Sequence, residues 1–486
     1  MREEIIARFL MALVALALLL WCSPVGAQAS EPAPAPSGAD VPTDVRTEDG
    51  SPAVSKEPEP DFIAAKTYLP EWLLKNKREG RYVTGVPAIG FDTEAGFNGG
   101  VLLEIFDNGS REDPFFRVTP YRQNISIIAT ISTEGDQAYL FRLDQPYLLD
   151  SPYRLRFAGG YMRTDIANYF GVGNEAMDPL SFPGLPGVTF SRFDPYQDAL
   201  DQEAGGFTYA KYNKYRLRQG IVFAALERDL LGGIVRPLIG LQASHVSIGD
   251  FTGSLVDAAG NVEAIQQPTK LSEDCAAGRI RGCTGGWDNF VKLGLTLDTR
   301  DFEPDPNSGL IAQLTAELAT HAVGSSFTYQ RLTSSVAGFV TPYPDIARLV
   351  LAGRVLYSMQ FGEVPFFSLD TYAFNSRDRF GLGGLETLRG FRRDRFIGEA
   401  GALLNVEARW SITEWEIWRQ HLRPSLVPFL DTGRVFDDVG ATTFRGWRVG
   451  YGAGLRLAWN LATVIRFDFG LSGEDQLFYL DIGHQF

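Results

Sequence analysis

An alternation of apolar and polar residues constrains this chain more than any other feature of its sequence, and it runs from about residue 82 to the end. In residues 463–471 one face is apolar and consists of Ile465, Phe467, Phe469 and Leu471. Arginine, aspartate and glycine occupy the positions between them. Because a period of two places successive side chains on opposite faces of a strand, the pattern predicts strands with one apolar and one polar face.

The polar faces carry arginines and acids on strand after strand, and tryptophan stands at strand ends such as Trp447 and Trp459. The expected strands run over about 10 to 16 residues, whereas strands of soluble proteins most often have about 5 to 6. Long strands with an apolar outer face and a polar inner face are typical of outer-membrane β-barrels. The sequence therefore predicts an all-β transmembrane barrel rather than a soluble sheet.

Sixteen candidate strands follow this alternation, and a closed bacterial barrel requires an even number. They are 82–91, 97–107, 116–132, 137–146, 153–163, 208–228, 234–249, 288–300, 309–320, 326–341, 346–360, 401–412, 424–437, 444–459, 461–471 and 476–486. If the first strand runs outward, the long connections 164–207, 250–287 and 361–400 all lie outside. Short periplasmic turns and longer external loops are typical of these barrels. We therefore expect a 16-stranded antiparallel transmembrane β-barrel over residues 82–486.

Residues 1–27 have the features of a secretory signal peptide. Two arginines precede an apolar run over residues 9–21, and small residues lead up to Ala27, where a signal peptidase would cleave. The alternative is a lipoprotein anchor at Cys22, but the bulky Trp21 occupies the preceding position, where a small residue is normally needed.

Two further segments precede the expected barrel. Residues 28–61 are rich in Pro, Ala and Glu, and we expect a disordered linker because they hold too few large apolar side chains to offset the entropy of ordering. Residues 62–81 contain several large apolar side chains, interrupted by Pro70. This short periplasmic segment is either an amphipathic helix at the rim of the barrel or a disordered tether, and the sequence leaves both open.

The net charge of −14, from 45 Lys and Arg against 59 Asp and Glu, argues against nucleic acid as a partner. After removal of the signal peptide two cysteines remain, Cys275 and Cys283, with seven residues between them. In an exported chain this spacing favours a disulfide in the fourth external loop, since a metal site would need further ligands and the chain has only 4 His. We expect no metal and no cofactor.

Residues 383–391 read GGLETLRGF and lie in the connection between the eleventh and twelfth expected strands. Four of them form a motif: Leu388, Arg389, Gly390 and Phe391. With this [V/I/L]-R-G-[F/Y] pattern the chain resembles the BamA/TamA superfamily, the bacterial surface antigen barrels, and the resemblance covers essentially all of 82–486. It implies that this sixth extracellular loop folds inward into the lumen.

The resemblance also implies that Arg389 contacts acidic residues of the inner wall. The matching positions are Glu407, in NVEARW of the twelfth strand, and Asp431, in FLDTG of the thirteenth. The alternation independently places Glu407 on the inner face, together with Asn405 and Arg409. A guanidinium can hold two carboxylates in a fixed geometry. Two plainer interpretations stay open: Arg389 is a solvated loop arginine, or FLDTG is only a strand that enters a turn.

The last strand resembles the C-terminal β-signal by which the barrel assembly machinery receives outer-membrane barrels during biogenesis. The residues that match it are Phe478, Leu480, Ile482 and Phe486. The expected location is thus the bacterial cell outer membrane. The partners to expect there are outer-membrane lipid, lipopolysaccharide, the assembly machinery itself and a protein or lipid cargo that the sequence does not identify.

The resemblance implies an insertase or transporter role in outer-membrane biogenesis or in translocation of protein or lipid. BamA and TamA carry POTRA domains before the barrel, and residues 28–81 are too few for one, so we expect a member that lacks them. The alternative is a passive porin-like or structural barrel. An enzyme is not expected, because no nucleophile signature lies beside any of the scattered histidines His245, His321, His421 and His484.

Overall fold

The computed structural model describes residues 60–64, 66, 68–69, 74, 77–94, 96–256, 262–302, 305–343, 348–370, 381–417, 420–459 and 463–482. The expected signal peptide, residues 1–27, lies outside the described residues. All but the last two residues of the expected linker, 28–61, lie outside them as well.

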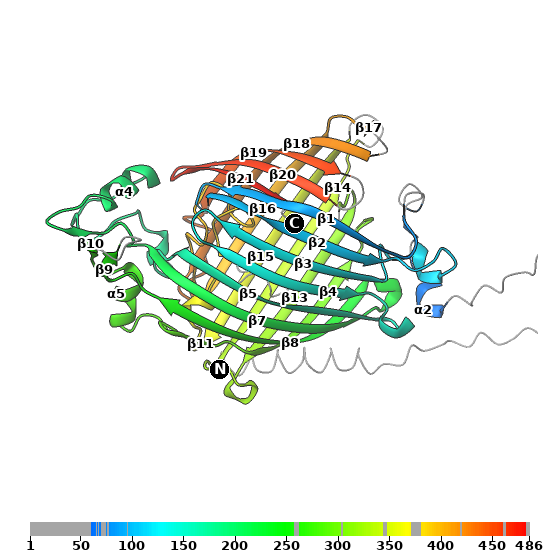
Figure 1. Cartoon of the computed structure of the whole chain (residues 1–486), viewed down its shortest axis with the longest axis horizontal. Coiled ribbons are helices and arrows are strands. Elements are labelled where there is room, and N and C mark those ends of the chain that lie inside the picture. Colours follow the sequence, from blue (N-terminus) through cyan, green and yellow to red (C-terminus); the bar gives the residue numbers. More distant parts are fainter. Residues whose placement is uncertain are drawn as a thin grey trace, which may run out of the picture.

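In the described residues sixteen long strands form one antiparallel sheet, which closes into a barrel where β1 pairs with β21 (Figure 1). The first seven are β1 (Arg81–Asp92), β2 (Gly96–Asp107), β3 (Gln123–Ser132), β4 (Gln137–Gln145), β5 (Tyr153–Asn168), β7 (Lys214–Arg228) and β8 (Val235–Gly249). The other nine are β12 (Phe290–Asp298), β13 (Gly309–Ala319), β14 (Tyr329–Val340), β15 (Leu349–Gly362), β16 (Ala400–Ser411), β18 (Gln420–Phe436), β19 (Arg448–Trp459), β20 (Thr463–Ser472) and β21 (Gln476–Ile482). The fold expected from the alternation is confirmed.

The starts of two strands differ from the expected ones by six or seven residues. β3 begins at Gln123 instead of residue 116, because Pro114–Arg117 forms the 3-10 helix η1, which Asp113 caps. A proline suits the first turn of a helix, since its fixed φ is helical and it has no N–H to satisfy. β7 begins at Lys214 instead of residue 208, because Phe207–Thr208 belongs to a separate small sheet.

The alternation decides what each face of the wall contacts. Outward side chains such as Val101 and Val355 are more than half exposed, as a lipid-facing surface should be. Inward charges are buried and paired between neighbouring strands: Lys292 Nζ lies 2.8 Å from Glu317 Oε1, and Glu317 also binds Arg331. A buried charge without such a partner would be costly, so the inner wall is held by ion pairs.

The long connections 169–213, 250–289 and 363–399 lie together at the end of the barrel on the left of Figure 1, which we call the external end. Their regular elements are α4 (Phe193–Leu200), α5 (Lys270–Ala276) and a small sheet of β6 (Phe207–Thr208), β10 (Val262–Gln266) and β9 (Gly253–Val256). Two short strands also extend the barrel sheet, β11 (Gly285–Trp287) beside β8 and β17 (Trp415–Ile417) beside β18.

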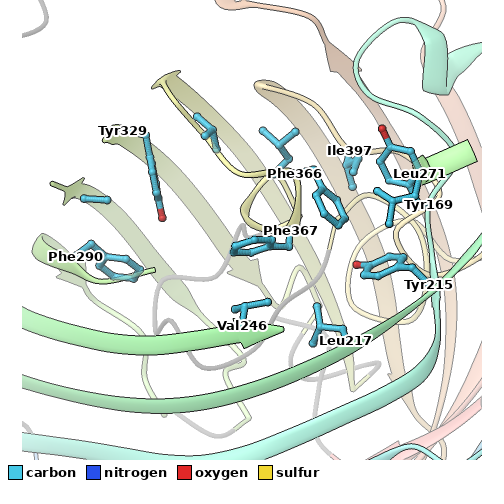
Figure 2. Close-up of a cluster of buried hydrophobic side chains, with 13 residues drawn as sticks. Tyr169, Tyr215, Leu217, Val246, Leu271, Phe290, Tyr329, Phe366, Phe367 and Ile397 are labelled. Carbon is cyan, nitrogen blue, oxygen red and sulfur yellow. The ribbon is translucent and has the colours of Figure 1, made fainter. Parts of the chain in front are cut away.

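Apolar side chains from all three long loops pack together in the external mouth (Figure 2). Tyr169 comes from the third loop, Leu271 from the fourth, and Phe366 and Phe367 from the sixth. They pack against inward side chains of the wall such as Tyr215. Apolar side chains of the described residues therefore pack across the external mouth.

The opposite end carries the short turns and the helix α2 (Asp61–Ala64), on the right of Figure 1, and we call it the periplasmic end. Short 3-10 helices occur in connections at both ends: η1 (Pro114–Arg117), η2 (Leu148–Asp150), η3 (Glu175–Met177), η4 (Leu231–Gly233), η5 (His321–Val323), η6 (Phe366–Ser368) and η7 (Val439–Ala441). Among the residues described, no helix has the length and apolar character needed to cross a membrane.

A closed barrel should show heat-modifiable migration, because a sheet without a free edge resists detergent until it is boiled. We expect unboiled and boiled samples of the membrane-extracted protein to run at different positions on a denaturing gel. Identical migration of the two samples would contradict closure by β1 and β21.

Candidate functional site

The candidate site lies where loop six, residues 363–399 between β15 and β16, meets the inner wall of the barrel. Leu388 and Phe391 anchor the loop in an apolar cluster with Leu356 of β15, Leu403 of β16 and Val435 of β18. All five side chains are buried. The motif therefore lies inside the lumen with an apolar residue packed on each side of its arginine and glycine.

Arg389 is completely buried and binds three carboxylates from three strands. Its Nε and Nη2 lie 2.7 and 3.0 Å from the two carboxylate oxygens of Asp431 on β18. Its Nη1 lies 2.9 Å from Glu407 Oε1 on β16 and 3.0 Å from Asp468 Oδ2 on β20. The pairing with Asp431 uses two parallel N–H bonds, the geometry that fixes the plane of a guanidinium.

Two further arginines share these carboxylates. Arg409 Nε lies 2.9 Å from Glu407 Oε2, and Arg456 Nη2 lies 3.1 Å from Asp468 Oδ2. The site thus combines three guanidiniums with three carboxylates, all buried. Equal numbers of opposite charges let the cluster leave water without a net buried charge.

An asparagine and a further arginine hold the carboxylates and the loop in place. Asn405 Nδ2 donates to Asp431 Oδ1 and to the carbonyl oxygen of Thr387, both at 2.7 Å. Arg354 of β15 in turn donates to Asn405 Oδ1 and, at 2.7 Å, to the carbonyl oxygen of Glu386. The loop backbone on the N-terminal side of Arg389 is therefore fixed to the same strands as its side chain.

Glycines on β19 and β20 give the loop room to approach the wall. Asp431 faces Gly450 across the β18–β19 pairing, and a Cβ at Gly450 would overlap the carbonyl oxygen of Arg389. A Cβ at Gly470 would lie 2.6 Å from the backbone nitrogen of Gly390. Gly390 itself has φ 88° and could not carry a side chain without strain.

The arginine also rests on an aromatic ring. Cζ of Arg389 lies 3.4 Å from the ring centroid of Phe429 on β18. Phe429 in turn faces Gly452 across the β18–β19 pairing, where a Cβ would lie 2.7 Å from Cζ of the ring. A desolvated cation–π contact of this kind adds to the ion pairs.

The last strand contacts loop six directly. The backbone nitrogen of Gly390 donates to the hydroxyl of Tyr479 on β21 at 3.3 Å. Arg392 Nε and Arg395 Nε lie 2.6 Å from carboxylate oxygens of Asp475 and Glu474 in the turn before β21. Loop six therefore joins β15 and β16 to the C-terminal strand that closes the barrel.

Comparison with protein families matches residues 123–486 to the Omp85 superfamily domain. The chain belongs to the Omp85 superfamily. A domain of unknown function matches the preceding residues 59–122. A search of the curated proteins found no match.

Solved structures of Omp85-type barrels are similar to this chain at low identity. BamA from Haemophilus ducreyi lacking POTRA domains 1–3 is 12% identical with a TM-score of 0.49, and the match covers 84% of this chain and 70% of that one. CdiB from Acinetobacter baumannii is 11% identical with a TM-score of 0.43, covering 83% and 60%, and CdiB from Escherichia coli is 12% identical with a TM-score of 0.45, covering 82% and 62%. The chain thus spans less than two thirds of the length of either CdiB.

Membership of the Omp85 superfamily and the 16-stranded barrel place this protein in the bacterial outer membrane. The structure places Arg389 of the motif beside Glu407 and Asp431. Asp468 and Arg456 were missed as partners. Both residues occupy inward-facing positions of their alternating strands. The sequence signal that points to Asp468 is therefore a charged residue at an inward position on a strand near β16 and β18.

The C-terminal residues divide between the two faces of β21. Phe478 is exposed on the outer face, and Leu480 shares this phase, whereas Leu477 and Tyr479 are buried inside. The side chain of Ile482 and the whole of Phe486 lie outside what the structure describes. The β-signal assignment stays a prediction.

The histidines lie apart in the fold. His245 is in β8 against the Trp287 ring, and His321 begins η5. His421 lies in β18, and His484 falls outside the described residues. Within the described part of the chain, no group of three or more His, Cys, Asp or Glu residues is arranged to hold a metal ion.

Replacing Arg389 with alanine should release loop six while leaving the barrel closed. Removing one partner of a buried ion pair typically costs about 3 to 5 kcal/mol, because charges stay buried without compensation. The strand hydrogen bonds are untouched, so we expect normal heat-modifiable migration but protease-sensitive sites within residues 363–399. Lysine should rescue poorly, since it cannot pair with several carboxylates in one plane. Limited proteolysis of intact cells measures this.

Matched variants separate the site from general effects. Gly450→Ala should act in the same direction as Arg389→Ala, because the new Cβ overlaps the backbone of Arg389. Gly338→Ala in β14 is the control, since a Cβ there meets nothing within 4 Å. Loop six as well protected in Arg389→Ala as in the parent protein would rule out its pinning role.

The cysteines of the fourth loop should be linked in the exported protein. In the structure Cys275 lies at the end of α5 with its Cα 6.0 Å from that of Cys283, and the two sulfurs are bonded. We expect mass mapping without reductant to find one cross-linked peptide. Two free thiols in correctly folded protein would refute the link.

Proposed function

We propose that this Omp85 protein is an insertase or transporter of outer-membrane biogenesis or of protein or lipid translocation, and that it works at the seam between β1 and β21. Membership of the superfamily supports the class of function. The pairing between β1 and β21 supports the place where the wall would open. No catalytic step is part of it.

The short pairing of the seam carries the proposal. In the described residues β1 pairs with β2 through all twelve of its positions, from Arg81↔Asp107 to Asp92↔Gly96. Across the seam the described register pairs are Phe91↔Leu480 and Asp92↔Tyr479, both at the external end. Backbone hydrogen bonds hold adjacent strands together, so a join with few pairs is the easiest one in the wall to open.

In the described residues both register pairs of the seam lie near the external end, an arrangement that suits opening from the periplasmic end. The contact there is supported by Thr93, whose hydroxyl accepts from the backbone nitrogen of Phe478 at 3.1 Å, and by the neighbouring rings of Phe91 and Phe478. Towards the periplasm, the edge of β1 that faces β21 can pair with a strand of an incoming chain, because edge strands readily pair with an added strand.

The filled lumen weighs against a passive porin. Loop six occupies the lumen beside β15 to β21, and apolar residues of three loops fill the external mouth. A porin-like or structural barrel remains the second candidate, and it predicts that solute flux, not membrane composition, depends on the protein.

A cross-link across the seam tests the route. Phe91→Cys with Leu480→Cys places a cysteine pair at one register pair, and oxidation should lock the seam. In a deletion strain of the source bacterium we expect outer-membrane protein or lipid content to change and the parent gene to restore it. The double-cysteine protein should restore it only in the presence of reductant.

The matched control is Val101→Cys with Ala129→Cys, a register pair in the continuous β2–β3 wall. This control protein should restore the outer-membrane composition of the deletion strain whether it is oxidised or reduced. A locked seam that restores as well as the control would rule out the seam mechanism. A deletion strain with altered solute uptake and unchanged membrane composition would favour the porin alternative.

A further inference from the structure

The chain before β1 is fastened to the periplasmic turns through an apolar contact. We call residues 62–69 and 77, as far as they are described, the strap. Ile63 is fully buried against Phe115 and Val118 of the β2–β3 turn and Tyr147 of the β4–β5 turn. The Phe62 ring lies 6.1 and 6.0 Å from the rings of Phe115 and Tyr147. The strap therefore spans two neighbouring turns with its apolar side chains.

An ion pair ties the strap to a third turn. Lys66 Nζ lies 2.5 Å from Asp229 Oδ2 in the β7–β8 turn and 4.8 Å from the centroid of the Tyr147 ring. Both side chains of the pair are largely buried. A Cβ at Gly233 would lie 2.8 Å from Lys66 Nζ, so this turn leaves the space that the ammonium group occupies.

The C-terminal end of the strap is fastened by hydrogen bonds. Lys77 Nζ donates to the carbonyl oxygens of Phe116 and Thr119 at 2.6 and 2.7 Å. The backbone nitrogen of Leu69 donates to the carbonyl oxygen of Arg117 at 2.8 Å. Lys77 is buried, and this burial lowers the pKa of its ammonium group to about 8.

The strap lines a cavity at the periplasmic end of the barrel. The cavity has a volume of about 360 Å³, and its lining includes Tyr68 and Leu69 of the strap. From the wall it includes Arg154 of β5, Arg236 of β8 and Asp298 of β12. Arg236 and Asp298 form an ion pair at 2.9 Å and share the inward phase of their strands, so the cavity is the periplasmic end of the lumen.

Loop six reaches a different part of the wall. The polar contacts of its residues 386–390 include Arg354 of β15, Asn405 and Glu407 of β16, Asp431 of β18, Asp468 of β20 and Tyr479 of β21. Elsewhere the loop also contacts Arg331 of β14 and Asn168 of β5. The cavity under the strap is bordered instead by β5, β8 and β12 and by the turns beside them. The strap and the part of loop six around Arg389 therefore lie against different strands of the barrel.

We propose that the strap is a periplasmic lid, latched by Lys66 and Asp229, which closes the part of the lumen that loop six leaves empty. This assigns a role to the first part of residues 59–122, the segment matched by a domain of unknown function. With the apolar cluster at the external end and loop six beside β15 to β21, the lid seals the barrel to small solutes while its wall remains free to open. The lid does not depend on the proposed function, since it concerns solute flux without cargo.

Conductance of the full mature chain in planar bilayers tests the lid. Ile63→Asp combined with Lys66→Ala removes the apolar anchor and the latch, and we expect steady conductance several-fold above the low value of the parent protein. The control is Arg111→Ala, which breaks an exposed ion pair with Glu79 in the same region and should match the parent. Heat-modifiable migration of each variant checks that the barrel has formed.

A reversible disulfide between the strap and the β7–β8 turn tests the lid if the double variant does not fold. Lys66→Cys with Asp229→Cys replaces the ion pair by a disulfide that can be opened and closed in the assembled protein. Reductant should raise its conductance and oxidant should return it to the parent value, with the parent protein in the same reductant as the baseline. The lid proposal would be overturned if conductance were the same with the disulfide open and closed. It would also be overturned if the parent protein already conducted like an open pore.

Discussion

The fully buried guanidinium of Arg389 is the interaction on which the interior of this barrel depends. A charge removed from water costs several kcal/mol unless opposite charges and hydrogen bonds replace its hydration, and here three carboxylates do so at 2.7 to 3.0 Å. These carboxylates come from β16, β18 and β20, so the site exists only when loop six and this wall are both in place. The arginine therefore couples the position of one loop to the arrangement of several strands.

The close approach of the loop requires a wall that is thin on its inner side. The β18–β19 register sets Gly450 beside Asp431 and Gly452 beside Phe429, so the two groups of β18 that contact Arg389 each have a glycine for a neighbour. The backbone of loop six occupies the volume that side chains at Gly450 and Gly470 would fill. Packing and electrostatics thus act together, because the ion pairs reach their short distances only where no Cβ intervenes.

Three separate sets of contacts lie along the barrel from one end to the other. Apolar side chains of three loops pack in the external mouth, loop six lies against β15 to β21, and the strap rests on the periplasmic turns near β5 and β8. A barrel filled in this way offers its wall, rather than its lumen, as the place where a large molecule could pass. The join between β1 and β21 has the fewest described register pairs with which to resist such opening. The proposed lid and the proposed seam are therefore complementary features of one architecture.

The alternation in the sequence by itself determined the sixteen strands, their inward and outward faces and the position of the long loops at one end, because a strand has a strict period of two. It also placed Glu407 and Asp468 on the inner face, and resemblance to a known motif linked Arg389 to Glu407 and Asp431. The phase of one strand says nothing about its register against the next, however. Only the tertiary structure decided that Asp468, Arg456 and Phe429 meet at the same arginine, and that Gly450 faces Asp431. The strap was likewise beyond the sequence, since the side chains that hold Lys66 and Ile63 come from turns as far as 163 residues away along the chain and become neighbours only when the sheet closes.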